Sequence, residues 1–291
     1  FNLLLGQPMG KFLRLKQQTD HHAIRLINLL LSFERYKLPA YQRILLADSE
    51  KAIKGRVRSS AAILAGNGPS FALLEGNIYD LSSVDVFTCN YSYKSSSFSS
   101  VSPTFHFIID PKLVDGTWPV TMVDEIISLS PDTMVVLDVR WSGISEMQRF
   151  RNLSNVSWIL PLYFPSFYSA LSSMGFSSGF HGLNVVSCSF SVATFLGYRH
   201  LGIIGVEADG LFREIVNQPS HFYPESNRDV SLSSFDLMVD SLYLSTHQLY
   251  AWKGCVAAAS RLGVGIYNLS NIGILDVCPR QSIARFLALA D

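Results

Sequence analysis

The sequence predicts an α/β protein with a doubly wound, mostly parallel sheet, and three observations support this fold class. From residue 60 onward, short apolar runs alternate with stretches of helical periodicity. The first of these runs, Ala61–Ala65, leads directly into a glycine-rich turn. The chain has 291 residues, of which 48% are hydrophobic and 16% charged. This composition suits one large domain with a sizeable core.

The first 58 residues differ from the rest of the chain. Lys, Arg and His side chains are interleaved there with Leu and Ile at helical spacing. This pattern predicts two or three amphipathic helices with a break near Pro39. We therefore expect a helical N-terminal extension over residues 1–58 that packs on a sheet domain over residues 59–291. A basic amphipathic segment also suits contact with an anionic membrane surface or a partner, and this alternative stays open.

Seven short apolar runs are predicted to be strands, namely 61–65, 84–89, 104–109, 133–138, 156–160, 201–205 and 264–268. Residues 187–196 are small and apolar, which is typical of a helix packed close to a sheet. Residues 233–262 are predicted to form a long helix, with Ser233 or Ser234 as N-cap and Gly263 as its stop. The serine-rich segment 92–102 and the segment 207–228 are both predicted to be mobile loops.

The turn after the first strand reads Gly66-Asn67-Gly68-Pro69-Ser70. Its glycines permit backbone angles and close approaches that a side chain would block. A strand that ends in such a turn presents backbone N–H groups to an anion, normally a phosphate, and Asn67 adds a side-chain donor and acceptor. Ser70 is suited to cap a following helix. The alternative is an ordinary strand-to-helix turn, and the turn alone leaves both interpretations open.

Polar residues also end the next two strands. Asn90 follows the second predicted strand, and Asp110, before Pro111, follows the third. An open parallel sheet binds its ligands at the carboxyl ends of its strands. Each residue alone is explained by a strand-terminal turn, but three such ends in succession favour a nucleotide crevice. The prediction is therefore a single, Rossmann-like nucleotide-binding domain.

A long loop after the strand 201–205 concentrates ionisable side chains, among them Glu207, Asp209, His221 and Tyr223. Loops at the carboxyl ends of sheet strands often carry catalytic groups. His221 follows Pro219-Ser220 and lies on no periodic apolar face, so we predict it to be a functional general base. His106, inside a predicted strand, is instead expected to be a hydrogen-bonded core histidine.

Several function classes are disfavoured. Lys plus Arg and Asp plus Glu number 23 each, so no net charge favours nucleic-acid binding. The four cysteines lie far apart, which predicts reduced buried thiols and no zinc site. No apolar run reaches the roughly twenty residues of a membrane span. The chain contains neither a GxSxG elbow nor a Walker A lysine.

Several of these pieces together resemble one family. They are AGNGPS at 65–70, DVFTCN at 85–90, LGYRHLGIIGVE at 196–207, SHFY at 220–223 and GIYNLS at 265–270. They resemble the bacterial CMP-sialic-acid-dependent sialyltransferases of the lipo-oligosaccharide type, over about two thirds of the chain. The resemblance implies a glycosyltransferase of cell-surface glycan biosynthesis. It would transfer a sialic-acid-like sugar from a CMP-linked donor to a glycan hydroxyl by a metal-independent inverting displacement, without a cofactor.

The resemblance also implies roles for individual residues. His221 matches the family's general base. The expected nucleotide-sugar contacts are Gly66, Asn67, Gly68, Ser70, Asn90, Asp110, Asn184, Ser187, Glu207, Tyr223 and Ser270. The chain departs from the family at three points. Asp110 replaces an asparagine before proline, Asn184 and Ser187 stand where a Thr-Ser-Gly helix entry is usual, and Tyr223 takes the place of missing phosphate-binding tyrosines.

Two other classes stay open. The hydroxymethylpterin pyrophosphokinase-like superfamily, which includes flagellin-modifying glycosyltransferase-like proteins, shares the glycine turn and often has Asp-Pro after the third strand. Pyrophosphoryl transfer from ATP needs Mg²⁺, for which Asp110, Glu207 and Asp209 are candidate ligands. A non-catalytic nucleotide-binding module would keep the turn without needing His221. We expect a cytoplasmic protein, with peripheral contact with the inner membrane face and homo-oligomerisation as further hypotheses.

Overall fold

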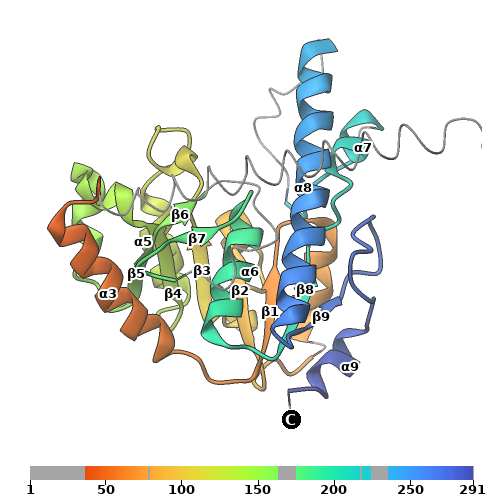
Figure 1. Cartoon of the computed structure of the whole chain (residues 1–291), viewed down its shortest axis with the longest axis horizontal. Helices are drawn as coiled ribbons and strands as arrows, with labels where there is room; N and C mark the ends of the chain where they lie inside the picture. The colour runs from red at the N-terminus through yellow and green to blue at the C-terminus, as the bar shows by residue number, and fades with distance from the viewer. Residues whose placement is uncertain (1–36, 78, 163–174, 217, 224–234, 291) are drawn as a thin grey trace, which may run out of the picture.

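A seven-stranded, entirely parallel sheet forms the centre of the structure (Figure 1), a computed structural model that describes residues 37–77, 79–162, 175–216, 218–223 and 235–290. Its strands are β1 (Ala61–Ala65), β2 (Asp85–Cys89), β3 (Phe105–Ile108), β4 (Met134–Asp138), β5 (Val156–Ile159), β8 (His200–Ile204) and β9 (Gly265–Asn268). All seven correspond to the predicted runs, so the predicted fold class is confirmed. A small second ladder, β6 (Pro161–Leu162) with β7 (Phe180–His181), was not predicted.

The strand order is β5-β4-β3-β2-β1-β8-β9. The chain first builds the sheet outward from β1 to β5 and then returns to the other side of β1 with β8 and β9. The order therefore reverses between β1 and β8, which pair in register from Ala61 opposite His200 to Ala65 opposite Ile204. In open α/β sheets, ligands bind at the carboxyl ends of the strands at such a switch point. The glycine turn directly follows β1 at this place.

Helices cover both faces of the sheet. Helices α6 (Val185–Leu196) and α8 (Phe235–Arg261) pack on one face, where they meet Leu64, Phe87 and Phe107 in one apolar cluster. The opposite face carries the 3-10 helix η1 (Pro69–Asn77), α5 (Thr121–Leu129) and α9 (Ile283–Leu287). Successive strand residues alternate between these clusters, as the two-residue repeat of a strand requires. The sheet is therefore buried on both faces, which explains why its strands read as continuous apolar runs.

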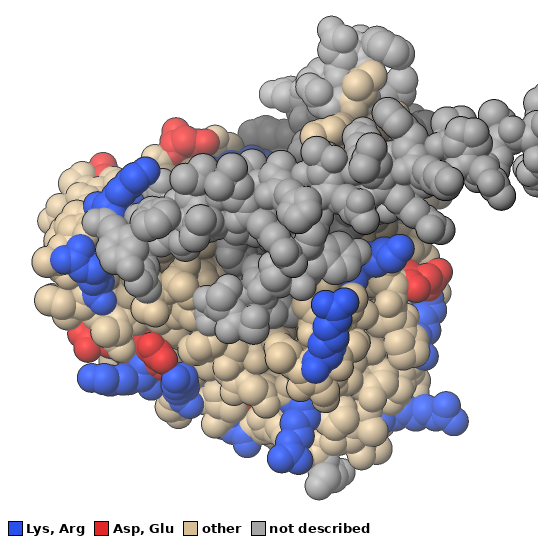
Figure 2. Space-filling view, viewed as in Figure 1, with Lys and Arg blue, Asp and Glu red and all other residues tan. Residues whose placement is uncertain are grey.

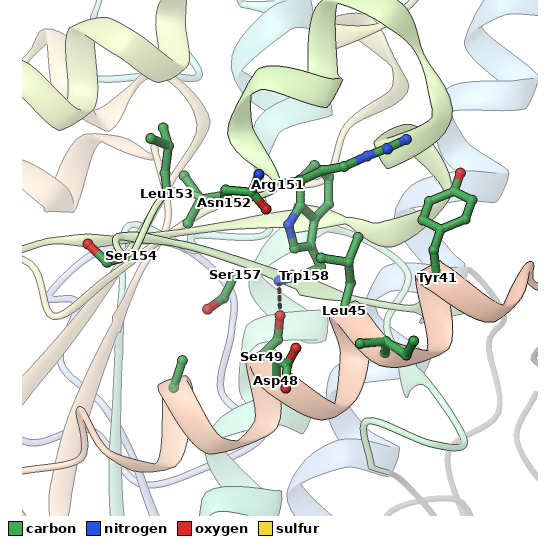
Figure 3. Close-up of a pocket in the computed structure, with 13 residues that line it drawn as sticks. Tyr41, Leu45, Asp48, Ser49, Arg151, Asn152, Leu153, Ser154, Ser157 and Trp158 are labelled. Carbon is green, nitrogen blue, oxygen red and sulfur yellow. Dashed lines mark hydrogen bonds between the residues drawn. The ribbon is translucent and has the colours of Figure 1, made fainter.

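Helix α3 (Ala40–Lys54) covers the edge strand β5. Ser49 on α3 accepts a hydrogen bond from the backbone N–H of Trp158 at 2.8 Å (Figure 3), so the helix satisfies a donor that the edge strand would expose. A cavity of about 440 Å³ lies between α3 and the chain before β5. The domain boundary near residue 58 stays a prediction, and most of the basic N-terminal segment lies outside the described residues.

Two loop predictions need correction. The segment 92–102 forms parts of η2 (Asn90–Lys94) and α4 (Phe98–Val101), which bury Tyr93, Phe98 and Val101. These three buried side chains anchor the serine-rich segment, so the prediction of a mobile loop was wrong. The segment after β8 contains a short helix, α7 (Gly210–Ile215). The long helix is present as α8 and stops before Gly263, at φ +77°, whereas Ser233 and Ser234 lie outside the described residues.

The remaining elements are the 3-10 helices η3 (Pro111–Leu113), η4 (Val139–Gly143) and η5 (Ser145–Phe150). All four cysteines are buried and unpaired, as predicted. Among the described helices, none combines the length and the apolarity that a membrane crossing requires. Figure 2 shows Lys and Arg side chains scattered over the visible face, some of them beside Asp or Glu side chains.

A buried carboxylate joins the amino ends of the central strands. Asp85, at the start of β2, is 0% exposed. It accepts hydrogen bonds from the backbone N–H of Arg58 at 2.9 Å, the Thr104 hydroxyl at 2.8 Å and the Tyr198 hydroxyl at 2.8 Å. Burial and the adjacent carboxylate raise the pKa of Tyr198, which keeps its hydroxyl a donor. Asp85 thus ties together segments that lie before β1, β3 and β8.

We expect Asp85→Ala to lower the free energy of unfolding by about 3 kcal/mol or more. It leaves the hydroxyls of Thr104 and Tyr198 and the backbone amides of Arg58 and Ser59 without their acceptor. Urea denaturation of the purified variant measures this loss. The matched control is Asp124→Ala, which removes an exposed partner of Arg149 and should cost less than about 1 kcal/mol. Equal losses for the two variants would contradict the role given to Asp85.

Candidate functional site

The turns that follow β1 and β8 touch backbone to backbone at the switch point. The N–H of Gly66 donates to the Ile204 carbonyl and the N–H of Gly68 donates to the Gly205 carbonyl, both at 2.8 Å. A Cβ atom on Gly66 would lie 2.4 Å from the Gly205 oxygen, and one on Gly205, where φ is +67°, would lie 2.2 Å from the Gly66 oxygen. Glycine is therefore required on both sides of this contact.

The same geometry gives protein acceptors to three of the backbone amides that were predicted to face an anion. The N–H groups of Gly66 and Gly68 are occupied by carbonyls, and the N–H of Ser70 donates to the carboxylate of Glu207 at 3.0 Å. Ser70 does not cap a helix with its side chain, because its hydroxyl accepts the N–H of Gly205 at 2.8 Å. The glycines and Ser70 thus build the turn, and the amides of Gly66, Gly68 and Ser70 are bonded within the protein.

Buried side-chain oxygens in the turns after β1 and β2 lack a partner among the described residues, and they include the Oγ of Ser92 in η2. The Oδ1 atoms of Asn67, after β1, and of Asn90, after β2, are buried and form no hydrogen bond with the described residues. An unsatisfied buried acceptor costs roughly 1–3 kcal/mol, so such atoms are rare and call for an explanation. A ligand that donates hydrogen bonds to these oxygens would supply the missing partner.

The backbone carbonyl of Asn90 is hydrogen-bonded to a buried histidine. His106, on β3, is 0% exposed, and its Nε2 lies 3.1 Å from the Asn90 carbonyl oxygen. Its Nδ1 lies 2.9 Å from the Thr88 hydroxyl. Burial lowers the pKa of His106 to about 3, although the bond to Asn90 opposes this effect. The prediction of a hydrogen-bonded core histidine is confirmed, but its link to Asn90 was missed because strand pairing alone reveals it.

The segment 220–223 lies against both asparagine-bearing turns. The backbone N–H of Phe222 donates to the Asn67 carbonyl at 3.0 Å, and its ring stacks on Phe71 at 4.6 Å between centroids. Tyr223 lies 5.6 Å, centroid to centroid, from the ring of Tyr91, the residue after Asn90. The structure therefore brings the neighbourhoods of Asn67, Asn90 and His221 together across about 150 residues of sequence, as the nucleotide-crevice prediction requires.

His221 is half-buried, and its ring packs at 5.2 Å from that of Tyr223. Its Nδ1 lies 3.3 Å from the hydroxyl of Ser220. If Nδ1 carries the proton and donates a hydrogen bond to Ser220, Nε2 carries the lone pair that a general base needs.

Tyr91 was not singled out from the sequence, although its position directly after a polar strand end is a usable signal.

Four residues predicted to contact the nucleotide form local hydrogen bonds. The Asp110 carboxylate accepts the N–H of Lys112 at 3.0 Å and so caps η3. Asn184 and Ser187 form a reciprocal capping box at the start of α6, with the Ser187 N–H donating to Asn184 at 2.9 Å. Ser270 is buried, and its hydroxyl donates to the Ile272 carbonyl at 2.9 Å. These bonds give the four residues a local structural role, and their contact with a nucleotide stays a prediction.

The carboxylates considered for Mg²⁺ do not converge. Asp110 caps η3, Glu207 accepts the Ser70 amide, and Asp209 pairs with Arg213 at 2.8 Å. Within the described part of the chain, no three His, Cys, Asp or Glu side chains form a group that could hold a metal ion. Of the three, Glu207 joins the turns after β1 and β8, whereas Asp110 and Asp209 form local contacts.

No family model matches the sequence, and no curated protein is similar to it in sequence. Among solved structures, the chain is similar to sialyltransferases of Campylobacter jejuni. An α-2,3-sialyltransferase in apo form is 16% identical with a TM-score of 0.40, over 78% of this chain and 82% of that one. CstII in complex with CMP is 15% identical with a TM-score of 0.42, over 81% and 86%. Similarity at this level identifies neither the activity nor the site residues of this chain.

The close contact between the two turns can be tested with a pair of glycines. We expect Gly205→Ala to cost at least about 3 kcal/mol of folding stability, since its Cβ would overlap a backbone oxygen. Gly197→Ala is the matched control, because Gly197 also has a positive φ of +86° but no atom within 4 Å of an added Cβ. It should cost only about 1–2 kcal/mol. Equal losses in urea denaturation would show that the contact is not restrictive.

The buried neutral His106 predicts a pH dependence of stability. The unfolded chain takes up a proton at this residue as the pH falls below about 6.5, whereas the native state does so only near a pKa of about 3. As the pH decreases from about 6.5 to about 3, the free energy of unfolding should therefore decrease by up to about 1.4 kcal/mol per pH unit. Urea denaturation at about pH 7.5 and about pH 5 measures it. His106→Phe should lose about 2 kcal/mol less than the wild type, and an identical loss would contradict the assignment.

Proposed function

We propose that this protein is a glycosyltransferase that moves a sialic-acid-like sugar from a CMP-activated donor to a glycan hydroxyl. One observation carries the proposal. Two buried asparagine oxygens without partners, on Asn67 and Asn90, lie at the switch point of a parallel sheet beside the segment that bears His221. Nucleotides bind open α/β sheets at this place.

The two asparagines are the proposed nucleotide contacts. A side-chain amide oxygen accepts hydrogen bonds, and CMP offers donors in its cytosine amino group and its ribose hydroxyls. The sequence resemblance around AGNGPS and DVFTCN supports CMP over other nucleotides. Gly66, Gly68, Ser70 and Glu207 would act indirectly, by fixing the turn that carries Asn67.

His221 is the proposed general base. Its Nε2 would take the proton of the acceptor hydroxyl while the oxygen attacks the anomeric carbon of the donor. The bond from that carbon to the phosphate oxygen breaks, and CMP leaves with the electron pair. A single displacement of this kind inverts the anomeric centre. The Ser220 hydroxyl can accept a hydrogen bond, so its contact with Nδ1 is compatible with the required tautomer.

The negative charge that develops on the phosphate needs a donor, and Tyr223 is the proposed one. Its ring contacts His221 on one side and Tyr91 on the other, so it lies between the base and the Asn90 turn. A metal-independent reaction agrees with the carboxylates of this edge, which are engaged in caps and ion pairs. Stabilisation by preorganised donors is worth several kcal/mol in comparable sites.

Nucleotide selectivity and two variants test the proposal together. Thermal shifts with CMP, CDP, UDP, GDP and ATP plus Mg²⁺ should show stabilisation by CMP. His221→Ala should lower kcat by roughly two to four orders of magnitude and leave the CMP dissociation constant nearly unchanged. Asn90→Ala should instead weaken CMP binding about tenfold, since it removes one buried hydrogen bond to the ligand.

Matched controls are available on the same chain. His200→Ala alters a histidine at the amino end of β8, and Asn152→Ala alters an exposed asparagine beside α3. Both should keep CMP affinity and turnover. Stabilisation by ATP with Mg²⁺ but not by CMP would favour the pyrophosphokinase-like alternative, and full activity of His221→Ala would remove the general-base assignment.

A further inference from the structure

We infer that His106 is a positioning residue for the nucleotide, because it fixes the backbone of Asn90 and so aims the Asn90 side chain at the ligand. The inference rests on the proposed function, in which Asn90 contacts CMP. His106 itself is fully buried on β3 and contacts no ligand. Its effect on binding must therefore pass through the residue that it holds.

The hydrogen bonds of His106 define its tautomer. A backbone carbonyl only accepts, so Nε2 must carry the proton that it donates to the Asn90 oxygen at 3.1 Å. Nδ1 is then an acceptor, and the Thr88 hydroxyl donates a hydrogen bond to it at 2.9 Å. Thr88 and Asn90 lie two residues apart, on either side of the last residue of β2. The imidazole therefore bridges the point at which the strand ends.

The backbone of Asn90 needs such support. Its φ is +48°, in the left-handed region that non-glycine residues enter at a cost of roughly 1–2 kcal/mol. Asparagine tolerates this region better than most residues, which fits its presence here. The bond from His106 holds the Asn90 carbonyl in this conformation. The direction of the Asn90 side chain follows from it, because the backbone angles fix where Cβ points.

Packing around the imidazole keeps it in place. The rings of Phe98 and Tyr93 meet it edge to face, at 5.5 Å and 6.5 Å between centroids. Both rings are buried. Tyr93 lies in η2, which begins at Asn90, and Phe98 lies in α4, the next helix. Phenylalanine at position 106 would keep these aromatic contacts and lose only the hydrogen bonds. Glutamine would keep a donor close to the place of Nε2.

A double-mutant cycle on CMP affinity tests the inference. Asn90→Ala and His106→Phe should each weaken CMP binding about tenfold, and the double variant should bind about as weakly as Asn90→Ala alone. His106→Gln should retain CMP affinity within about threefold of the wild type, because it restores the donor. In steady-state kinetics, His106→Phe should raise the donor KM about tenfold and change kcat by less than about threefold.

Several results of these measurements would overturn the positioning role of His106. If His106→Phe weakens binding in the Asn90→Ala background as much as in the wild type, the histidine acts through general stability and the positioning role is overturned. Wild-type CMP affinity of His106→Phe overturns it as well. If the wild-type protein binds no CMP, the proposed function fails and the positioning role fails with it. Additive losses with normal wild-type binding overturn only the role of His106.

Discussion

The backbone contact between Gly66 and Gly205 is the constraint on which the rest of the site depends. Parallel strands β1 and β8 lie side by side, so the turns that follow them emerge at the same edge and must pass each other. Only two residues without Cβ atoms allow the 2.8 Å hydrogen bonds that join these turns. Glu207 then closes the junction by accepting the Ser70 amide. The position of Asn67, and of the segment that binds its carbonyl, follows from this junction.

The sequence was sufficient to predict the sheet but not every element around it. The seven strands are buried on both faces, so their apolar runs are continuous and easy to recognise. The two-residue strands β6 and β7 carry no periodicity and were missed for that reason. Residues 92–102 were misjudged because their serines mask the spacing of Tyr93, Phe98 and Val101, whose burial only the folded chain reveals.

Predicting the site was harder, because one residue type serves two purposes at a strand end. Asp110 after β3 and Asp138 at the end of β4 each accept the N–H of the residue two positions later and cap a short 3-10 helix. Asn184 and Ser187 likewise satisfy each other. In sequence these residues look like ligand contacts, and only their hydrogen bonds distinguish a cap from a binding group. His106 and Tyr91 join the site through strand pairing and ring packing, which no local pattern announces.

The polar strand ends therefore divide into two groups along one edge of the sheet. Near the ends of β3 and β4, the carboxylates of Asp110 and Asp138 cap short 3-10 helices, and this role needs no ligand. On the side of β1 and β2, Asn67 and Asn90 keep buried oxygens without partners, each at a cost of roughly 1–3 kcal/mol. Ser92, Trp158 and His200 also carry a buried polar atom without a partner among the described residues. Asn67 and Asn90, however, lie on the half of the edge that adjoins the switch point, where open α/β sheets bind nucleotides. Local structure does not require them, so a ligand that donates hydrogen bonds is the simplest reason for their presence.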